Sequence, residues 1–323
     1  MESVSPARTT KLPLIDSHGR KVRKLRVSLL EDCNFRCHYC MPLDARFPHR
    51  SNRIPPDEIV RLCRILLDYG VEEIRLTGGE PTMRPEFNEI VTRLSELPLK
   101  MLALTTNASK LERLLPFLKT TNCKHINISL DSLKEERFNQ ITHSKHFTRV
   151  MRAIEATNDQ GFHTKLNVLA MRDVNDDEIL DFVDFSERTG IEVRFLELMR
   201  IGQARENQIS NFIPADDILE IIRGRYQLEV RTASYDSTSI NFKTTSGAKI
   251  GIIASESKPF CGACSRWRLS STGKLRPCLM KEEGHDIAYK NDDQLDEVFH
   301  KTLKLKPTGR IYEVPQNMNE IGG

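Results

Sequence analysis

The hydrophobic pattern of the first two thirds of the chain alternates between two periods. Short runs rich in β-branched and aliphatic residues are separated by segments whose apolar residues recur at the spacing of an amphipathic helix. The clearest helix covers residues 57–69 and ends at Gly70, a residue type that commonly terminates helices. Six β runs are expected, at residues 25–30, 73–77, 102–105, 125–131, 165–170 and 192–199. Repeated strand–helix units predict an α/β fold with a parallel sheet, and six units fit an incomplete (βα)6 TIM-like barrel better than a closed eight-fold one.

Within these strands, polar residues alternate with apolar ones, although a parallel sheet covered by helices is usually apolar on both faces. Because successive side chains of a strand point to opposite faces, each polar set shares one face. If the apolar face meets the helices, the polar face lines the lumen, which then contains at least four cations: Arg26, Arg75, Lys165 and Arg194. Buried cations without counter-charges are costly, so the pattern indicates a polyanionic ligand. An antiparallel sheet with a solvent-exposed face is the alternative, and the helical spacers argue against it.

The pattern changes near residue 225. Short β-like runs at residues 228–232, 239–244 and 249–254 are followed by a group of cysteines and a tail rich in Lys, Pro and Gly. We therefore expect three parts: an N-terminal extension at residues 1–21, a partial barrel at residues 22–225 and a smaller C-terminal cap domain at residues 226–323.

The composition is ordinary for a soluble protein, with 39% hydrophobic and 29% charged residues. No run approaches the roughly 18–20 apolar residues that span a bilayer, and the N-terminus lacks a secretory signal, so we expect a cytoplasmic protein without a membrane partner. A net charge of +3 is too small to indicate nucleic-acid binding. Eight cysteines in a reducing compartment favour metal ligation over disulfides. Six fall into two groups, whereas Cys63 and Cys123 are expected to be structural.

The first group consists of Cys33, Cys37 and Cys40, three thiols on one short segment with no fourth ligand beside them. A structural zinc site needs four protein ligands, usually drawn as two close pairs. An iron–sulfur cube held by three cysteines instead keeps one iron open. The spacing resembles that of the radical S-adenosylmethionine (SAM) superfamily. This resemblance implies that the open iron chelates SAM and that an electron from the reduced cluster cleaves SAM to a 5′-deoxyadenosyl radical.

Other positions extend this resemblance to a SAM site. Tyr39 precedes Cys40, and residues 77–81 read Thr-Gly-Gly-Glu-Pro at the end of the second expected strand. Glycines at a strand end allow another group to approach the backbone closely. In the superfamily this segment contacts the amino group of SAM, so the resemblance implies SAM contacts from Tyr39, Gly79, Ser129 and Met199.

The second group consists of Cys261, Cys264 and Cys278. Zinc, with His285 as a fourth ligand, is an alternative to an iron–sulfur cluster here. Arg266 and Arg268 follow the first two cysteines closely, and their planar forks suit a phosphate group or a purine edge. Surface salt bridges are the simpler interpretation of these two arginines.

Together the motifs resemble the GTP 3′,8-cyclase family of molybdenum-cofactor biosynthesis along nearly the whole chain. The matching segments are residues 14–20, 25–28, 33–40, 74–81, 104–107, 126–131, 194–195, 264–270 and 322–323. The resemblance implies two 4Fe–4S clusters, the second of which binds guanine at an open iron. It also implies a flexible tail, ending in Gly322 and Gly323, that inserts toward the active site. The implied GTP contacts are Arg26, Arg75, Thr105, Lys165 and Arg194 from the barrel and Arg266, Trp267 and Arg268 from the cap.

The implied reaction is the radical cyclisation of GTP to (8S)-3′,8-cyclo-7,8-dihydroguanosine 5′-triphosphate, the first step of the pathway. The 5′-deoxyadenosyl radical takes hydrogen from C3′, the C3′ radical adds to C8 of guanine, and one electron and one proton complete the product. The implied partners are an electron donor and, downstream, cyclic pyranopterin monophosphate synthase. The oligomeric state stays open, with a homodimer as one option.

Three departures from the family pattern are visible. Glu73 replaces a lysine that many members carry, Ala108 follows Asn107 where glycine is usual, and residues 44–53 differ from the common form. Two other functions stay open. One is a radical SAM enzyme with an auxiliary cluster that acts on a peptide or another small molecule. The other is a non-catalytic zinc or iron–sulfur protein, which needs neither the Gly-Gly-Glu strand end nor a cationic lumen.

Overall fold

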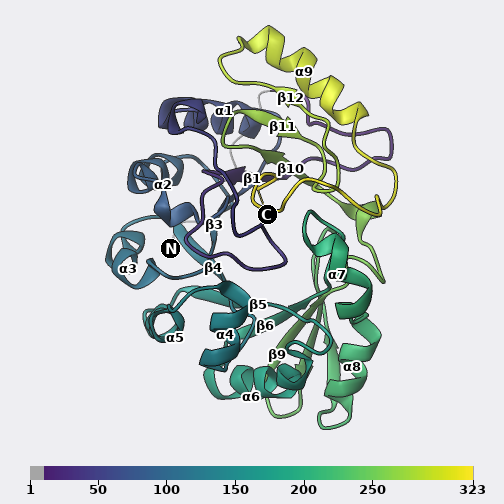
Figure 1. The fold of residues 1–323 in the computed structure, drawn as a ribbon. Helices are drawn as coiled ribbons and strands as arrows, with labels where there is room; N and C mark the ends of the chain where they lie inside the picture. The colour runs from purple at the N-terminus through teal and green to yellow at the C-terminus, as the bar shows by residue number, and fades with distance from the viewer. Residues whose placement is uncertain (1–10, 323) are drawn as a thin grey trace.

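The computed structural model describes residues 11–322, in which strands and helices alternate up to about residue 225 (Figure 1). The strands are β1 Lys24–Ser28, β2 Glu73–Thr77, β3 Met101–Thr106, β4 Cys123–Ser129, β5 His163–Leu169, β6 Glu192–Leu196, β7 Leu228–Arg231, β8 Ile240–Thr244, β9 Lys249–Ile253, β10 Arg266–Leu269, β11 Lys274–Arg276 and β12 His285–Asp286. The α-helices are α1 Pro56–Asp68, α2 Phe87–Ser95, α3 Leu111–Lys119, α4 Glu135–Thr142, α5 Phe147–Asp159, α6 Ile179–Thr189, α7 Ala204–Asn211, α8 Ala215–Arg223 and α9 Asp292–Lys304. Short 3-10 helices are η1 Arg50–Asn52, η2 Pro81–Met83, η3 Asp176–Glu178 and η4 Cys261–Ala263.

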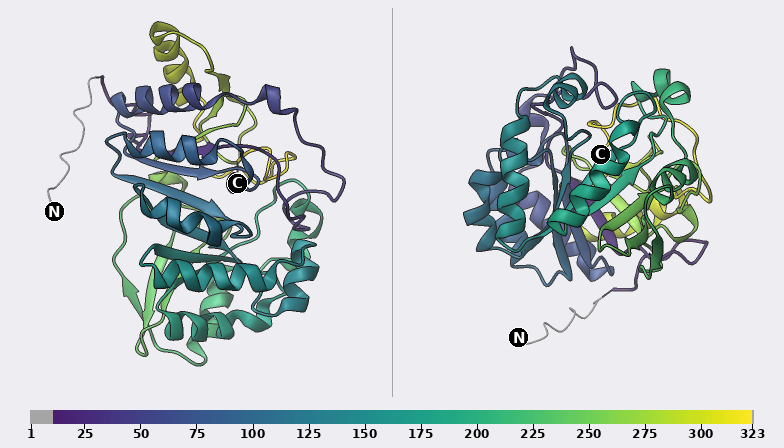
Figure 2. Two further views of the ribbon diagram at one scale, coloured as in Figure 1. Left: turned by 90° about the vertical axis from the view of Figure 1, so that its left-hand side faces the viewer. Right: turned by 90° about the horizontal axis from the view of Figure 1, so that it is seen from below.

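Strands β1 to β6 lie in sequence order and pair in parallel, each with the next. Helices α1, α2, α3, α5 and α6 follow one another along the outside of these strands, as Figures 1 and 2 show. Six parallel strands with an outer layer of helices confirm the predicted α/β fold of the partial-barrel type.

The apolar positions of these strands form the core between sheet and helices. Ile74, Leu76, Ile126, Ile128 and Leu166 are all at most 1% exposed. This burial confirms the orientation expected from the alternating pattern, because the polar residues between them must then face the lumen. Cys63 and Cys123 belong to the same core. Within residues 11–322, no helix is long and apolar enough to cross a membrane.

The boundary of β6 differs from the prediction. The strand ends at Leu196, so Met199 lies in the following loop rather than on the strand. The carboxylate of Glu197 accepts a hydrogen bond of 2.7 Å from the backbone N–H of Ala215, at the start of α8. It accepts another of 2.6 Å from the backbone N–H of Glu256. A buried carboxylate at a helix N-terminus is favourable, and these contacts end the extended run that the apolar residues indicated.

Strands from the C-terminal part extend both edges of the six-strand sheet. β10 pairs in parallel with β1, and β9 pairs in parallel with β6. The full sheet within the described residues has twelve strands in the order β12-β11-β10-β1-β2-β3-β4-β5-β6-β9-β8-β7. The domain boundaries at residues 21 and 225 stay predictions, and the sheet itself continues across residue 225.

Candidate functional site

A cavity of about 780 Å³ fills the lumen at the concave side of the sheet. Its walls come from the polar faces of β1 to β6, from the first cysteine segment and from the segment around the second cysteine group. The structure brings together nearly all site residues predicted from the sequence. Those that line the cavity are Arg26, Cys33, Cys37, Tyr39, Cys40, Arg75, Gly79, Thr105, Ser129, Lys165, Arg194, Met199, Cys261, Cys264, Arg266, Arg268 and Cys278.

Trp267 does not line the cavity and is a correction to the expected set. Strand β10 alternates its side chains, so Arg266 and Arg268 face the lumen while Trp267 points the other way. The indole is 0% exposed, and its ring centroid lies 6.0 Å from that of Phe299 in α9. The Trp267 side chain therefore packs α9 against β10 and does not face the cavity.

The cations in the lumen lie close enough to perturb one another. Burial, together with Arg268, Arg75 and Arg266, lowers the pKa of Arg26 well below its ordinary value. Burial and the Arg194 charge lower the pKa of Arg75 to about 10. A shift in this direction means that the charged form is destabilised, and a bound anion relieves that cost. The electrostatics of the lumen therefore favour a polyanion.

Two carboxylates moderate this charge, and only Glu73 was singled out from the sequence. Glu192 lies 3.0 Å from the Nζ of Lys165 and 2.6 Å from the Nε of Arg194. Glu73, which replaces the family's usual lysine, lies 3.5 Å from the Nζ of Lys24 on the neighbouring strand. Lys24 and Glu73 are register partners in β1 and β2, so the departure at residue 73 is matched by a cation directly beside it.

The first cysteine group is held by a tight turn. The backbone N–H of Cys40 donates to the carbonyl of Cys37 at 2.9 Å. The N–H of Phe35 and the amide of Asn107 both donate to the Cys33 Sγ, at 3.4 and 3.7 Å. Burial raises the pKa of Cys33 to about 11 and that of Cys40 to about 12. Such thiols lose their protons when a metal cluster binds, so the donors to Sγ fit a site for thiolate ligands.

The Gly-Gly pair lets the end of β2 pass directly against this segment. A Cβ at Gly79 would lie 2.1 Å from the carbonyl oxygen of Asp32, and one at Gly78 would lie 2.3 Å from that of Leu30. The N–H of Gly79 donates to Leu30 at 2.8 Å. The two glycines therefore let the loop after β2 pack against the backbone of the cysteine segment. Both segments line the candidate SAM site. The side chain of Glu80 points away from the lumen, because it is buried and accepts from Thr106 and the N–H of Asn107.

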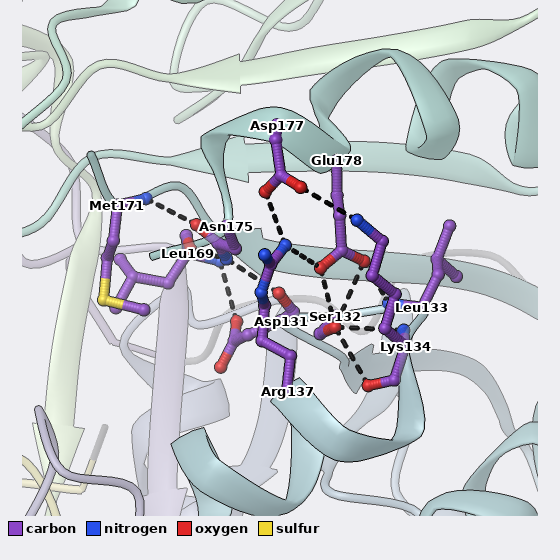
Figure 3. A network of polar contacts seen from close by, with 10 residues as sticks. All are labelled: Asp131, Ser132, Leu133, Lys134, Arg137, Leu169, Met171, Asn175, Asp177 and Glu178. Carbon is purple, nitrogen blue, oxygen red and sulfur yellow. Dashed lines mark hydrogen bonds and ion pairs between the residues drawn. The ribbon is translucent and has the colours of Figure 1, made fainter. Parts of the chain in front are cut away.

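Asp131 holds the ring of Tyr39 at the cavity wall. The Tyr39 hydroxyl donates to the Asp131 carboxylate at 2.6 Å, and the N–H of Leu169 donates to its other oxygen at 2.8 Å. Asn175 donates to the carbonyls of Asp131 and Leu169, which ties the ends of β4 and β5 together (Figure 3). Burial raises the pKa of Asp131 to about 6.

The same network continues behind Asp131 to Glu178. Its carboxylate accepts from the hydroxyl of Ser132 and the N–H of Leu133, at 2.8 and 2.6 Å, and pairs with Arg137 at 2.6 Å (Figure 3). Such a fully hydrogen-bonded buried carboxylate fixes the loop that follows β4.

The second cysteine group lies beside basic side chains, toward the other end of the strands: Cys264 precedes β10, which pairs in parallel with β1, whereas Cys33 follows β1. The Nζ of Lys306 lies 3.6 Å from the Cys264 Sγ and donates to the carbonyl of Arg266 at 3.0 Å. Burial alone would raise the pKa of Cys264, but Arg266 and Lys306 offset it and lower the pKa to about 7. The three thiols share one wall of the cavity and fit a cluster that faces the lumen.

His285, the alternative fourth ligand for zinc, is not directed at this group. Its Nδ1 lies 3.0 Å from the hydroxyl of Thr302 in α9, and the residue does not line the cavity. Within residues 11–322, no three His, Cys, Asp or Glu side chains are grouped so as to hold a single metal ion.

The C-terminal segment returns to the mouth of the lumen, where Figure 1 shows it in yellow beside β1 and β10. The N–H of Met318 donates to the carbonyl of Cys40 at 3.3 Å, and Asn319 donates to that of Glu31 at 3.3 Å. Gly322 accepts from Arg268, and Gly323 lies outside the described residues.

Comparisons with known proteins decide the family. Residues 27–186 match the model of the Radical SAM superfamily, and residues 191–311 match Molybdenum Cofactor Synthesis C. The chain is 45% identical to the GTP 3′,8-cyclase of Synechocystis sp. over 96% of its own length and 95% of that protein. This chain belongs to the GTP 3′,8-cyclase family. The GTP 3′,8-cyclase of Aquifex aeolicus is 37% identical over 85% of this chain and 87% of its own.

More distantly related proteins share the fold of this chain. Streptococcus suis SuiB, in a structure bound to S-adenosylmethionine, superposes with a TM-score of 0.62 at 15% identity and covers 88% of this chain and 68% of its own. At that identity the likeness shows the fold alone.

Several residues of the site went unnoticed in the sequence. Besides Glu192, they include His125 and His163, register partners on β4 and β5 whose stacked rings lie 4.5 Å apart at the cavity wall. Burial and His163 lower the pKa of His125 to about 4. Strand alternation could have predicted His125, because it lies two residues before Asn127 and four before Ser129 and therefore on the same face of the strand.

Proposed function

We propose that this chain catalyses the radical cyclisation of GTP to (8S)-3′,8-cyclo-7,8-dihydroguanosine 5′-triphosphate, the first step of molybdenum-cofactor biosynthesis. One observation carries the proposal: in a member of the GTP 3′,8-cyclase family, two groups of three cysteines and the six cations predicted from the sequence line a single cavity of about 780 Å³. The cavity volume lies within the usual range for ligand sites. Cytoplasmic location is part of the proposal.

Each group of three cysteines holds one iron–sulfur cluster. Cys33, Cys37 and Cys40 hold the radical-generating 4Fe–4S cluster, and Cys261, Cys264 and Cys278 hold the second one. When bound, the first cluster supplies the electron that cleaves SAM, and the second offers an open iron to guanine. Tyr39, Gly79, Ser129 and Met199 seat SAM between the cysteine segment and the strand ends.

The cations position GTP. Arg26, Arg75, Lys165 and Arg194, with Thr105, bind the nucleotide from the barrel, while Arg266 and Arg268 bind it from β10. Holding the ribose in one orientation places C3′ against the 5′ carbon derived from SAM and also brings C8 within reach, which makes both steps intramolecular in effect. Substrate and SAM bound in the lumen displace solvent from around the radicals.

The direct test is an anaerobic reaction of the reconstituted protein with SAM, dithionite and GTP deuterated at C3′. Mass analysis of the 5′-deoxyadenosine is the readout. Deuterium in that product supports GTP as the target and C3′ as the position attacked. Unlabelled 5′-deoxyadenosine contradicts the substrate assignment and favours a peptide or another small molecule as substrate.

Partners complete the proposal. SAM cleavage consumes one electron per event, so an electron donor is required. The product passes to a downstream cyclic pyranopterin monophosphate synthase. A homodimer is the proposed oligomeric state, and sedimentation of the reconstituted protein tests it.

A further inference from the structure

A second, smaller cavity of about 340 Å³ opens on the outer layer of helices, away from the lumen. Four exposed cations surround it: Lys110 and Arg113 at the start of α3, and Arg149 and Arg152 in α5. We call these four residues the basic pocket. Helices α3 and α5 pack against each other, so the two pairs of cations are held on one rigid surface.

The basic pocket carries unbalanced charge. Glu112 is the one carboxylate among the residues that line it, and it lies 3.7 Å from Arg152 in an exposed pair. Within the described part of the chain, Lys110, Arg113 and Arg149 make no ion pair. Exposed and unpaired cations of this kind attract an acidic partner over a distance of about a Debye length, roughly 8–10 Å.

The pocket also lies next to the segment that carries the first cysteine group. Ser109 lines the pocket, and its hydroxyl accepts from the amide of Asn34 at 3.0 Å, directly after Cys33. Asn107 completes the contact, because its amide donates to the Asn34 side chain at 3.0 Å and to the Cys33 Sγ at 3.7 Å. Asn34, the residue after Cys33, and Ser109 therefore link the cysteine segment to the lining of the pocket through one hydrogen bond.

We propose that the basic pocket is the docking surface for an acidic one-electron carrier protein that reduces the cluster held by Cys33, Cys37 and Cys40. In the transfer, the carrier's flavin or iron–sulfur centre loses one electron and the cluster gains it, with no bond made or broken. Redox partners bind through small interfaces and depend on charge for their association rate, which suits four exposed cations around a small cavity. The proposal rests on the function proposed above, because that function requires the electron.

The test compares two double charge reversals in the reconstituted, cluster-loaded protein. Arg113→Glu with Arg149→Glu removes the attraction at the basic pocket. Arg223→Glu with Arg231→Glu makes the same change of net charge on exposed positions of α8 and β7. The probe is a photoreduced flavodoxin, and the readout is the stopped-flow rate at which the cluster absorption bleaches, without GTP.

We expect the pocket variant to be reduced about 10- to 100-fold more slowly than the parent at low salt, and the control variant to keep the parent's rate. Added salt should remove most of the difference, and reduction by dithionite should be the same in all three proteins. The parent provides an independent check, since its rate with flavodoxin must fall steeply with ionic strength.

Equal slowing of both variants would overturn the proposal, because overall charge would then explain the effect. No slowing of the pocket variant would overturn it as well. If instead millimolar inorganic phosphate binds the pocket while charge reversal leaves the reduction rate unchanged, the cavity is an anion site and not a docking surface. Failure of the GTP cyclisation with dithionite as reductant would count against the proposed function alone, because the bleaching assay does not involve GTP.

Discussion

The guanidinium of Arg268 donates a 2.6 Å hydrogen bond to the carbonyl oxygen of Gly322. Arg268 lies on β10 and lines the lumen, whereas Gly322 belongs to the returning C-terminal segment. A residue proposed to bind the substrate therefore also binds the tail. If Arg268 binds GTP as proposed, this bond couples nucleotide binding to the seating of the tail.

Substitution of Gly322 tests that coupling. Gly322 has a φ of +72°, and an added Cβ would lie 2.8 Å from the Cβ of Ser28. In Gly322→Ala, backbone strain of about 1–2 kcal/mol and this contact should release the tail. We expect faster hydrogen exchange in residues 314–322 and at least a several-fold loss of cyclisation. Gly309→Ala is the matched control, since a Cβ there meets no atom within 4 Å; equal exchange in both variants would contradict the prediction.

Arg266→Ala should weaken GTP binding and spare SAM cleavage. Its guanidinium faces the lumen and lies over the ring of Phe260, at 4.9 Å from the centroid. Loss of a hydrogen bond to a charged group costs about 1.5–3 kcal/mol, so we expect GTP affinity to fall about 10- to 100-fold. Calorimetry gives the affinity, and 5′-deoxyadenosine formation with dithionite gives the cleavage rate. Exposed Arg231→Ala should match the parent, and an unchanged Kd for Arg266→Ala removes its assigned role.

Glu192→Gln should tighten GTP binding. The carboxylate pairs with both Lys165 and Arg194, so a triphosphate must compete with it for the two cations. A partly exposed ion pair of this kind contributes about 0.5–1 kcal/mol. Because GTP no longer has to break it in the variant, the affinity for GTP should rise about two- to fivefold. Glu229→Gln, at an exposed position of β7, controls for net charge. Weaker binding in Glu192→Gln would show that the carboxylate instead orients the two cations.

Asp131 should make the stability of the iron-free protein depend on pH. Burial raises its pKa to about 6, above the ordinary 3.8, so the folded protein binds the proton more tightly than the unfolded chain. The stabilising effect is fully present below about pH 4 and is lost as the pH rises through 6, with a total of up to about 3 kcal/mol.

Asp131→Asn removes this titration while keeping an acceptor for the Leu169 N–H. From pH 4.5 to 7.5, the free energy of unfolding of the variant should therefore rise relative to that of the parent by about 2 kcal/mol. Urea titrations of the two iron-free proteins at both pH values measure it. A constant difference between the proteins would mean that another group titrates in this window.

Loss of one cysteine from the second group should remove one cluster and leave the other. Reconstituted parent protein should contain about eight irons per chain, and Cys264→Ala about four. Because Cys33, Cys37 and Cys40 lie on a different segment, after the C-terminal end of β1, the variant should still cleave SAM with dithionite but bind GTP more weakly. Cys63→Ala, a buried core position, should keep about eight irons. Loss of SAM cleavage in Cys264→Ala would show that the two sites do not assemble independently.

The lumen could be predicted from the sequence because its signal is local. Alternation of Arg75 with Ile74 and Leu76 is enough to place the arginine opposite the core, and the cysteine spacing lies within eight residues. The same rule applied to residues 266–269 indicates that Trp267 faces away from Arg266 and Arg268. Trp267 was nevertheless expected to contact GTP, because the resemblance to the family implied it.

Other features depend on register and could not be predicted. Glu192 meets Lys165 because β5 and β6 pair at those two residues, and nothing in either segment specifies that alignment. The pairing of β10 with β1 joins residues more than two hundred positions apart, for which a single sequence contains no local pattern. The loop after Leu196 turns because of contacts that Glu197 makes with distant backbone groups.

The order of strands in the sheet has a consequence for how the protein is made. While the ribosome has released only β1 to β6, both outer strands of the half-built barrel present unpaired backbone groups. β9 covers one of these edges and β10 the other, and both are synthesised late. Nascent chains that stall before residue 249 therefore carry two open edges and are prone to aggregation, whereas completion of β10 closes the second edge and seats the Arg266 and Arg268 side chains in the lumen in the same event.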